Sequence, residues 1–222
     1  MVEPAEMAGD AFPIPPLIVH QLSRVLRLRD GDEVILLDGA GSQARCRLTR
    51  GGTMLEVLER GLSGGEPRHR LTVWQALLKG DGLERVVQQG TELGVATFRL
   101  ITTERVVARE ISERRLERLR AIARESTEQS ERGIVPSVEA PVPFERALES
   151  GAVLLFERAG VAHPGLGQIE PPPSVIIGPE GGFTPDEVGA AELSGVRLAG
   201  LGPRILRAES VAIAAAAVIL SR

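Results

Sequence analysis

Three loops in the C-terminal half of the chain combine glycines with charged side chains, and each follows a short apolar run. They span 156–160, 178–182 and 200–207. Glycine lets backbone N–H and C=O groups approach a ligand closely, and ligands of open α/β sheets bind beyond the carboxyl ends of the strands. We therefore expect the three loops to form one site, whose backbone hydrogen bonds and apolar walls suit a flat, neutral ring such as adenine.

Two other interpretations of the glycine loop 178–182 compete with a ligand site. Its composition also fits a plain tight turn. A phosphate-cradling loop is the weaker alternative, because neither the Walker spacing nor the Rossmann spacing is present and no lysine follows the loop.

The elements that must position these loops alternate between strand and helix from Leu71 onward. The sequence TPDE, from Thr184 to Glu187, predicts a helix start in which Thr184 is the N-cap and Glu187 closes a capping box. Apolar runs predict strands at 71–77, 98–102, 152–156, 175–177 and 197–199, and helical spacing predicts helices at 83–93, at 112–130 and from 209 onward. Such alternation predicts an α/β domain over 71–222 with a mainly parallel sheet.

The N-terminal part has a different pattern. Short strands are predicted at 33–37, at 43–48 and from Met54, with turn residues at 38–41 and 50–52. The segment 61–67 has the composition of a linker. We therefore expect residues 1–66 to form a separate small barrel or sandwich.

Composition excludes several classes of protein. Cys46 is the only cysteine and the three histidines are widely scattered, so no structural zinc or other metal site is expected. The longest apolar stretch, 211–220, is much shorter than the roughly 20 residues of a spanning helix, and no basic region precedes an apolar run at the N-terminus. These features predict a soluble, cytoplasmic protein with no membrane association.

The charge is less decisive. A net charge of −4 argues mildly against a nucleic-acid partner, although the distribution of charge matters more than its sum. Lys79 is the only lysine among the 26 lysine and arginine residues. A genome-level codon bias explains this skew. Arginine is also better suited than lysine to bidentate hydrogen bonds with phosphates and base edges.

Two longer motifs contain the second and third loops. Residues 177–184 have the sequence IGPEGGFT, and residues 201–210 have the sequence LGPRILRAES. Both resemble the signature motifs of the 16S ribosomal RNA uridine N3-methyltransferase family, which belongs to the SPOUT superfamily of knotted methyltransferases. Supporting similarities occur in the same order along most of the chain, at 20–32, 79–81, 91–95, 103–105 and 128–136.

The resemblance implies an α/β fold: a SPOUT methyltransferase domain at 71–222, with a mainly parallel sheet and a C-terminal trefoil knot. A PUA-like β-barrel that binds RNA would precede it, at 1–66. The implied enzyme is a homodimer that transfers a methyl group from S-adenosylmethionine to N3 of a specific uridine in 16S ribosomal RNA of the small subunit. The implied cofactor-binding residues are Leu155, Phe156, Glu157, Ile177, Gly178, Pro179, Gly181, Gly182, Leu201, Gly202, Ile205, Leu206 and Arg207.

The chemistry of uridine N3 points to charged residues near the cofactor loops. N3 carries a weakly acidic proton, so the site needs a proton acceptor, stabilisation of the developing negative charge, or both. We assign charge stabilisation to Arg207, with Glu209, Glu180 and Glu131 as candidate bases in that order. As alternatives, Arg207 pairs with Glu209, Glu180 accepts loop N–H groups, and Glu209 only complements the helix dipole.

RNA binding is expected from basic residues in both domains, namely Arg24, Arg27, Lys79, Arg105 and Arg132. Arg24, Arg27 and Arg132 fall within family motifs.

The chain departs from the family at four positions. Gln89 and Ile134 stand where basic residues are common, Gly82 where a larger residue is usual, and Glu131 where glycine is usual. No RNA contact is assigned to these four positions. Two other functions stay open: a SPOUT methyltransferase acting on transfer RNA or another ribosomal site, and an RNA-binding assembly factor without chemistry. A nucleotide-phosphate enzyme is a distant third.

Overall fold

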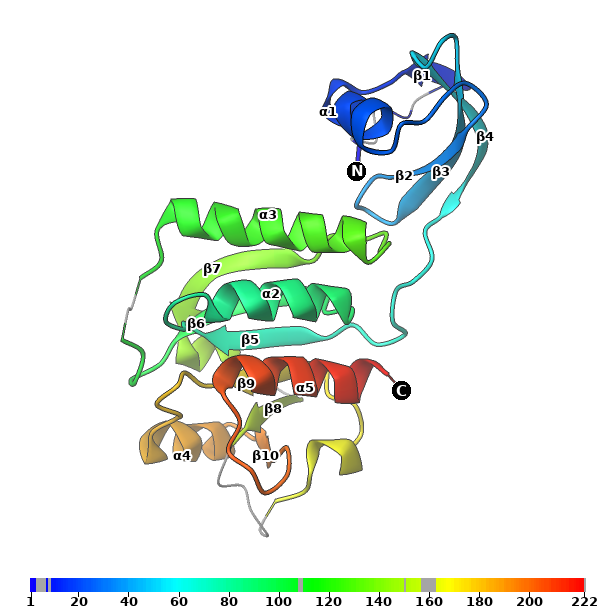
Figure 1. Ribbon diagram of the computed structural model, residues 1–222. Helices are drawn as coiled ribbons and strands as arrows, with labels where there is room; N and C mark the ends of the chain where they lie inside the picture. The colour runs from blue at the N-terminus through cyan, green and yellow to red at the C-terminus, as the bar shows by residue number, and fades with distance from the viewer. Residues whose placement is uncertain (3–6, 8, 108–109, 150, 157–162, 222) are drawn as a thin grey trace. The chain divides into compact units, whose positions relative to one another are not determined.

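The computed structural model describes the chain except for residues 3–6, 8, 108–109, 150, 157–162 and 222. Its contacts divide the chain into two compact units (Figure 1). The first comprises Met1–Glu66 together with Ser130–Val135, and the second comprises Pro67–Gln129 together with Pro136–Arg222. None of the helices in the described ranges is long and apolar enough to cross a membrane.

The first unit is built on a four-stranded antiparallel sheet in the order β1-β4-β3-β2. The strands are β1 (Ala11–Pro13), β2 (Glu33–Leu37), β3 (Ser42–Thr49) and β4 (Met54–Leu62), and α1 (Pro16–His20) continues into a π-helical turn, η2 (Gln21–Val25). The predicted strands at 33–37 and 43–48 are confirmed as β2 and β3. In the described residues β1 and β2 are the outer strands of this sheet.

Alternation along β3 divides apolar from charged side chains. Ala44, Cys46 and Leu48 are buried in the core of the unit, whereas Arg45 and Arg47 lie on the outer face. Burial raises the pKa of the Cys46 thiol, so Cys46 is a packing residue and not a nucleophile.

A second passage of the chain, Ser130–Val135, completes this unit. The Gly41 N–H donates to the Gly133 carbonyl, and the Val135 N–H donates to the Gly39 carbonyl, both at 3.0 Å. Gly133 lies so close to Ser63 that an added Cβ would overlap the Ser63 side chain. Only glycine fits at this position, and no local pattern in the sequence indicates that the segment returns here.

The second unit contains a six-stranded, fully parallel sheet in the order β10-β8-β9-β5-β6-β7. Its strands are β5 (Thr72–Ala76), β6 (Thr97–Thr102), β7 (Ser137–Pro143), β8 (Ala152–Leu155), β9 (Ser174–Ile177) and β10 (Arg197–Ala199). All residues of β8 and β9 are buried, as expected for strands covered on both faces. The predicted parallel sheet is confirmed.

Helices cover this sheet. Figure 1 shows α3 (Glu113–Gln129), α2 (Gly82–Glu92) and α5 (Ala208–Leu220) side by side over one face, while α4 (Pro185–Leu193) contacts β10. Short 3-10 turns, η3 (Phe144–Ala147) and η5 (Leu166–Gln168), follow β7 and β8.

Strand β7 was missed by the sequence prediction, which placed no strand between the long helix and β8. The reason is the prolines at 141 and 143, which cannot donate to a ladder. They are tolerated because β7 is the edge strand, paired with β6 alone.

Candidate active site

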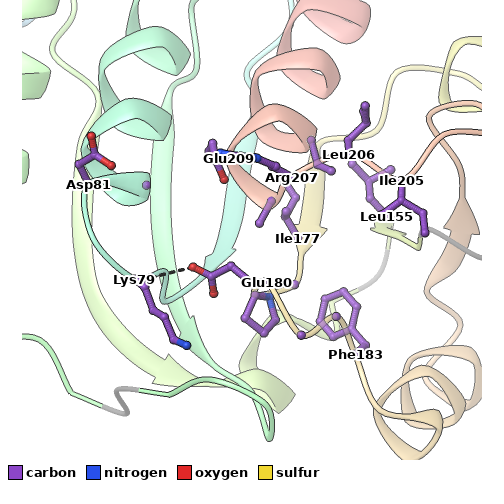
Figure 2. Close-up of a pocket in the computed structure, with 17 residues that line it drawn as sticks. Lys79, Asp81, Leu155, Ile177, Glu180, Phe183, Ile205, Leu206, Arg207 and Glu209 are labelled. Carbon is purple, nitrogen blue, oxygen red and sulfur yellow. Dashed lines mark hydrogen bonds between the residues drawn. The ribbon is translucent and has the colours of Figure 1, made fainter.

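A pocket of about 600 Å³ lies beyond the carboxyl ends of β5, β8 and β9 (Figure 2). This volume lies in the range of small-molecule sites, roughly 300–1,000 Å³. Its walls come from the β5–α2 loop, the end of β8, the glycine loop after β9 and the start of α5; the lining residues are Lys79, Asp81, Gly82, Leu155, Ile177, Gly178, Pro179, Glu180, Gly181, Gly182, Phe183, Ile205, Leu206, Arg207, Ala208, Glu209 and Val211.

The glycine loop is both a tight turn and a pocket wall. The Gly182 N–H donates to the Pro179 carbonyl at 2.9 Å, and Gly182 has a φ of +66°, a conformation that favours glycine. An added Cβ at Gly178 would be 3.1 Å from the buried Phe183 ring. The two interpretations of this loop in the sequence therefore do not exclude each other.

Arg105, from the loop after β6, braces the glycine loop from outside the pocket. Its Nη1 donates to the Gly181 carbonyl at 2.9 Å and to the Phe183 carbonyl at 3.2 Å. These contacts place Arg105 on the carbonyl side of the predicted cofactor loop. Its predicted role in RNA binding stays a prediction.

A second brace comes from the start of α4. The Thr184 hydroxyl accepts the Glu187 N–H at 3.2 Å, and one Glu187 oxygen accepts the Thr184 N–H at 2.9 Å, which confirms the predicted capping box. The other Glu187 oxygen accepts the Glu104 N–H at 2.8 Å. One carboxylate thus ties the loop after β6 to the helix that follows the glycine loop.

Glu180 joins the glycine loop to the β5–α2 loop. Its Oε1 accepts the backbone N–H of Lys79 at 2.9 Å, as the dashed line in Figure 2 shows. The alternative considered for Glu180 was that it accepts N–H groups of its own loop. It does accept an N–H, but from the β5–α2 loop. Because one oxygen is held in this way, the second oxygen is free to face a ligand in the pocket.

Arg207 and Glu209 form the opposite wall of the pocket, at the start of α5. Arg207 is the N-cap residue of this helix, and Glu209 lies in its first turn. In the described part of the chain no ion pair joins the two side chains, so the alternative in which Arg207 serves only as a partner of Glu209 has no support.

Comparison with known proteins agrees with this architecture. A family model described as an RNA methyltransferase domain matches residues 65–220, and one described as an RNA methyltransferase PUA domain matches residues 22–53. The ribosomal RNA small subunit methyltransferase E of Synechocystis is 35% identical, over 94% of this chain and 72% of the relative. The protein of the same name from Bacillus subtilis is 32% identical, over 90% of this chain and 86% of the relative.

The chain belongs to the ribosomal RNA small subunit methyltransferase E family. A crystal structure of the Neisseria gonorrhoeae methyltransferase E bound to S-adenosylmethionine superposes with a TM-score of 0.83 and 30% identity, covering 96% of this chain and 92% of that one.

The cofactor positions implied by resemblance to the methyltransferase E family fall in two adjoining hollows. Nine of them line the large pocket: Leu155, Ile177, Gly178, Pro179, Gly181, Gly182, Ile205, Leu206 and Arg207. Phe156, Leu201 and Gly202 line a smaller hollow of about 40 Å³, which shares Leu155, Leu206 and Val211 with the first. Glu157 lies outside the described residues.

The sequence prediction of this site omitted five residues that line the pocket, namely Asp81, Gly82, Phe183, Ala208 and Val211. Phe183 stands directly after the glycine loop in the motif, so its position offered a signal. Asp81 and Val211 come from elements that only the tertiary fold brings to the pocket. In the described residues no group of metal-ligating side chains gathers here or elsewhere.

The prediction for Arg132 requires a correction. Its side chain is only 4% exposed, and its guanidinium pairs with Glu66 at 2.7 Å within the first unit. Glu66 also accepts the Ile134 N–H at 3.2 Å. Arg132 therefore fastens the returning segment of the chain and is not presented to an RNA phosphate. Glu131, a candidate base, also belongs to the first unit and does not line the pocket.

Arg24 and Arg27 are exposed in the first unit. The loop that carries Arg27 is fastened to the β3–β4 turn by Asp30, whose carboxylate accepts the N–H groups of Gly51 and Gly52. This arrangement brings the exposed Arg29 and Arg50 to the same pair of loops, and the sequence prediction had not singled out Arg29.

The arginines on the outer face of the sheet in the first unit, Arg45 and Arg47, form ion pairs with glutamates. Arg47 donates to Glu33 at 2.9 Å, and Arg45 pairs with Glu33 at 3.0 Å and with Glu59 at 3.2 Å. The hydrogen bonds from Arg47 and then Arg45 lower the pKa of the Glu33 carboxyl. In the described residues no ion pair joins Arg24, Arg27, Arg29 or Arg50 to an acidic side chain, although the carboxylates of Asp30 and Asp32 accept backbone N–H groups in the same loops.

Proposed function

We propose that the protein transfers a methyl group from S-adenosylmethionine to N3 of a uridine in 16S ribosomal RNA of the small subunit. The observation that carries the proposal is the pocket, because the two signature motifs of the family meet there with Arg207 and Glu209 at its wall. Membership of the methyltransferase E family supports the reaction and the ribosomal substrate.

The residues of the pocket fit S-adenosylmethionine. Leu155, Ile177 and Leu206 supply apolar walls for the adenine and the methylene groups, and the glycine loop offers backbone groups at close range. Glu180 and Asp81 place negative charge beside a cofactor that carries a cationic sulfonium and an ammonium group. When bound, the cofactor supplies an electrophilic methyl group.

The residues of the chain then have to position the uridine and manage one proton. Arg207 stabilises the negative charge that spreads onto the uracil oxygens as N3 loses its proton. Glu209 is the preferred acceptor of that proton and Glu180 the next, since both carboxylates line the pocket. Holding N3 in line with the methyl carbon supplies much of the remaining acceleration.

The RNA is gripped by the first unit, through the two loops that Asp30 fastens together. Arg27, Arg29 and Arg50 are exposed on these loops, and Arg24 is exposed on η2, which precedes them. Charges of this kind neutralise phosphates and give affinity without sequence preference. The chemistry in the second unit and the grip in the first therefore respond to different substitutions.

Three further properties belong to the proposal. The second unit forms a homodimer, supported by Leu193 and Ile205, apolar side chains that are 92% and 79% exposed; light scattering would then give twice the monomer mass of 23.7 kDa. The chain forms a trefoil knot around the cofactor loops, as its resemblance to the SPOUT methyltransferases implies. The enzyme acts in the cytoplasm, where small subunits are assembled.

The substrate is tested by methyl transfer from labelled S-adenosylmethionine to small subunits that lack the modification, to bare 16S ribosomal RNA and to transfer RNA. We expect label in the small-subunit RNA. Label in transfer RNA alone would point to another SPOUT substrate. Cofactor binding without transfer to any of these RNAs would move the proposal to a different RNA, and absence of cofactor binding would favour an assembly factor.

A further inference from the structure

The one lysine of this protein lies in the proposed active site. Of 26 lysine and arginine residues, 25 are arginine, and the exception is Lys79. Only two described basic side chains, Lys79 and Arg207, line the large pocket. A codon bias explains why arginine is used everywhere else, but it does not explain why lysine is kept at one of these two positions.

A hydrogen bond from its backbone N–H fixes the position of Lys79. It follows β5, and its N–H donates to Oε1 of Glu180 at 2.9 Å. Figure 2 shows Glu180 between Lys79 and Arg207, so the two cations of the pocket lie on either side of this carboxylate. The side chain of Lys79 is exposed. In Figure 2 it extends away from Glu180 and Arg207, so a change of rotamer has to bring its ammonium to a ligand in the pocket.

A lysine and an arginine would behave differently beside Glu180. An arginine has a planar fork that forms bidentate pairs with carboxylates. At position 79 such a fork would be captured by Glu180 and withdrawn from the ligand. The lysine ammonium is a compact point charge, which can contact one oxygen of the substrate and leave Glu180 in its place.

The substrate of the proposed reaction offers two places where a positive group can stabilise charge. Loss of the proton from N3 spreads negative charge onto both O2 and O4 of the uracil, one on each side of N3. Arg207 can contact only one of these oxygens closely while N3 faces the methyl donor. A second cation, from another loop, can stabilise the charge on the other oxygen.

We propose that Lys79 is a catalytic residue whose ammonium contacts one uracil oxygen while Arg207 contacts the other. The inference rests on the proposed transfer to uridine N3 and replaces the expectation that Lys79 grips an RNA phosphate. The N3 proton leaves to a carboxylate of the pocket, and the N3 electron pair forms the new bond to the methyl carbon as the bond from that carbon to sulfur breaks. The ammonium keeps its protons and lowers the pKa of the bound N3–H.

The experiment measures single-turnover rates of 3-methyluridine formation with saturating cofactor and RNA, across a range of pH. We expect K79M and K79R both to be slower by about a hundredfold to a thousandfold, the effect of losing one stabilising donor. The pH dependence is specific to this role, because without the ammonium N3 ionises at a higher pH. The rising limb of the K79M profile should therefore move to higher pH.

Affinities separate this role from its two alternatives. RNA and S-adenosylmethionine dissociation constants of K79M should stay within about threefold of those of the wild type, and R118M, on the exposed face of α3, serves as the matched control. A K79R variant with wild-type rate would overturn the inference, and so would a loss confined to RNA affinity or to cofactor affinity. If the wild type itself forms no 3-methyluridine, the proposed function fails and this inference fails with it.

Discussion

Single residues carry strain at three positions where glycine would be favoured. Arg27 and Arg50 have φ values of +54°, and Glu131 has a φ of +57°. Arg27 and Arg50 lie on the two loops that are proposed to bind RNA. At these positions an arginine side chain that can contact a phosphate is kept despite the backbone strain. Glu131 lies at a position where glycine is usual in the family. Glu131 does not line the pocket, so no role in the proposed site accounts for its strained backbone.

Glu131→Gly should therefore stabilise the protein. Relief of the left-handed conformation is worth about 1–2 kcal/mol, and the greater freedom of glycine in the unfolded chain offsets about half of it. Urea unfolding should show a gain of up to about 1 kcal/mol. The same change at Glu125, inside α3, should cost about 1 kcal/mol. An equal loss at both positions would contradict the strain argument.

Arg207 is the residue on which the proposed chemistry depends most. Arg207→Ala should lower the single-turnover rate by about a hundredfold to a thousandfold, with cofactor affinity changed little. Arg197→Ala, an exposed arginine on β10, should leave the rate unchanged. A near-normal rate for Arg207→Ala would remove this side chain from the mechanism.

At the scale of elements, the pocket depends on loops that brace one another. Arg105 bonds two carbonyls of the glycine-loop region, and charge-assisted bonds of this kind contribute about 1.5–3 kcal/mol when buried. Because Arg105 is exposed, Arg105→Ala should weaken cofactor binding by only about threefold to tenfold. Calorimetric titration with S-adenosylmethionine measures this change. A drop in RNA affinity with normal cofactor affinity would return Arg105 to RNA binding.

The elements also show how far the sequence could predict the structure. Strands β8 and β9 were predicted because strands buried on both faces have continuous apolar sequences, and α4 because its capping box is local. Strand β7 was hidden by its prolines. The return of Ser130–Val135 to the first unit depends on contacts with Gly39, Gly41 and Glu66, which no local pattern reveals.

The predicted site follows the same rule. Residues within the two motifs were placed on the pocket, because motifs fix loops at strand ends. Roles that depend on tertiary contacts were missed, as for Arg132, which pairs with Glu66, and Arg105, which braces the glycine loop.

At the scale of the whole molecule, the proposed RNA-binding surface and the proposed active site lie in different units. Reversing Arg24 and Arg27 to glutamate should weaken RNA binding and make it less sensitive to salt, by about 0.7 in the logarithmic slope for each phosphate that is no longer neutralised. Cofactor affinity should stay unchanged. Arg118 and Arg124, both exposed on α3, provide the matched double reversal. Unchanged RNA affinity in the Arg24 and Arg27 variant would reject the assigned surface.

The proposed reaction of the whole molecule is methylation of N3 of a uridine in small-subunit RNA at this pocket. It is tested by nucleoside mass spectrometry of RNA from unmodified small subunits, after incubation with S-adenosylmethionine and either wild-type or Arg207→Ala protein. We predict 3-methyluridine at one site with the wild type and very little with the variant. A methyl group on another base or on a ribose, or equal 3-methyluridine with both proteins, would contradict the proposal.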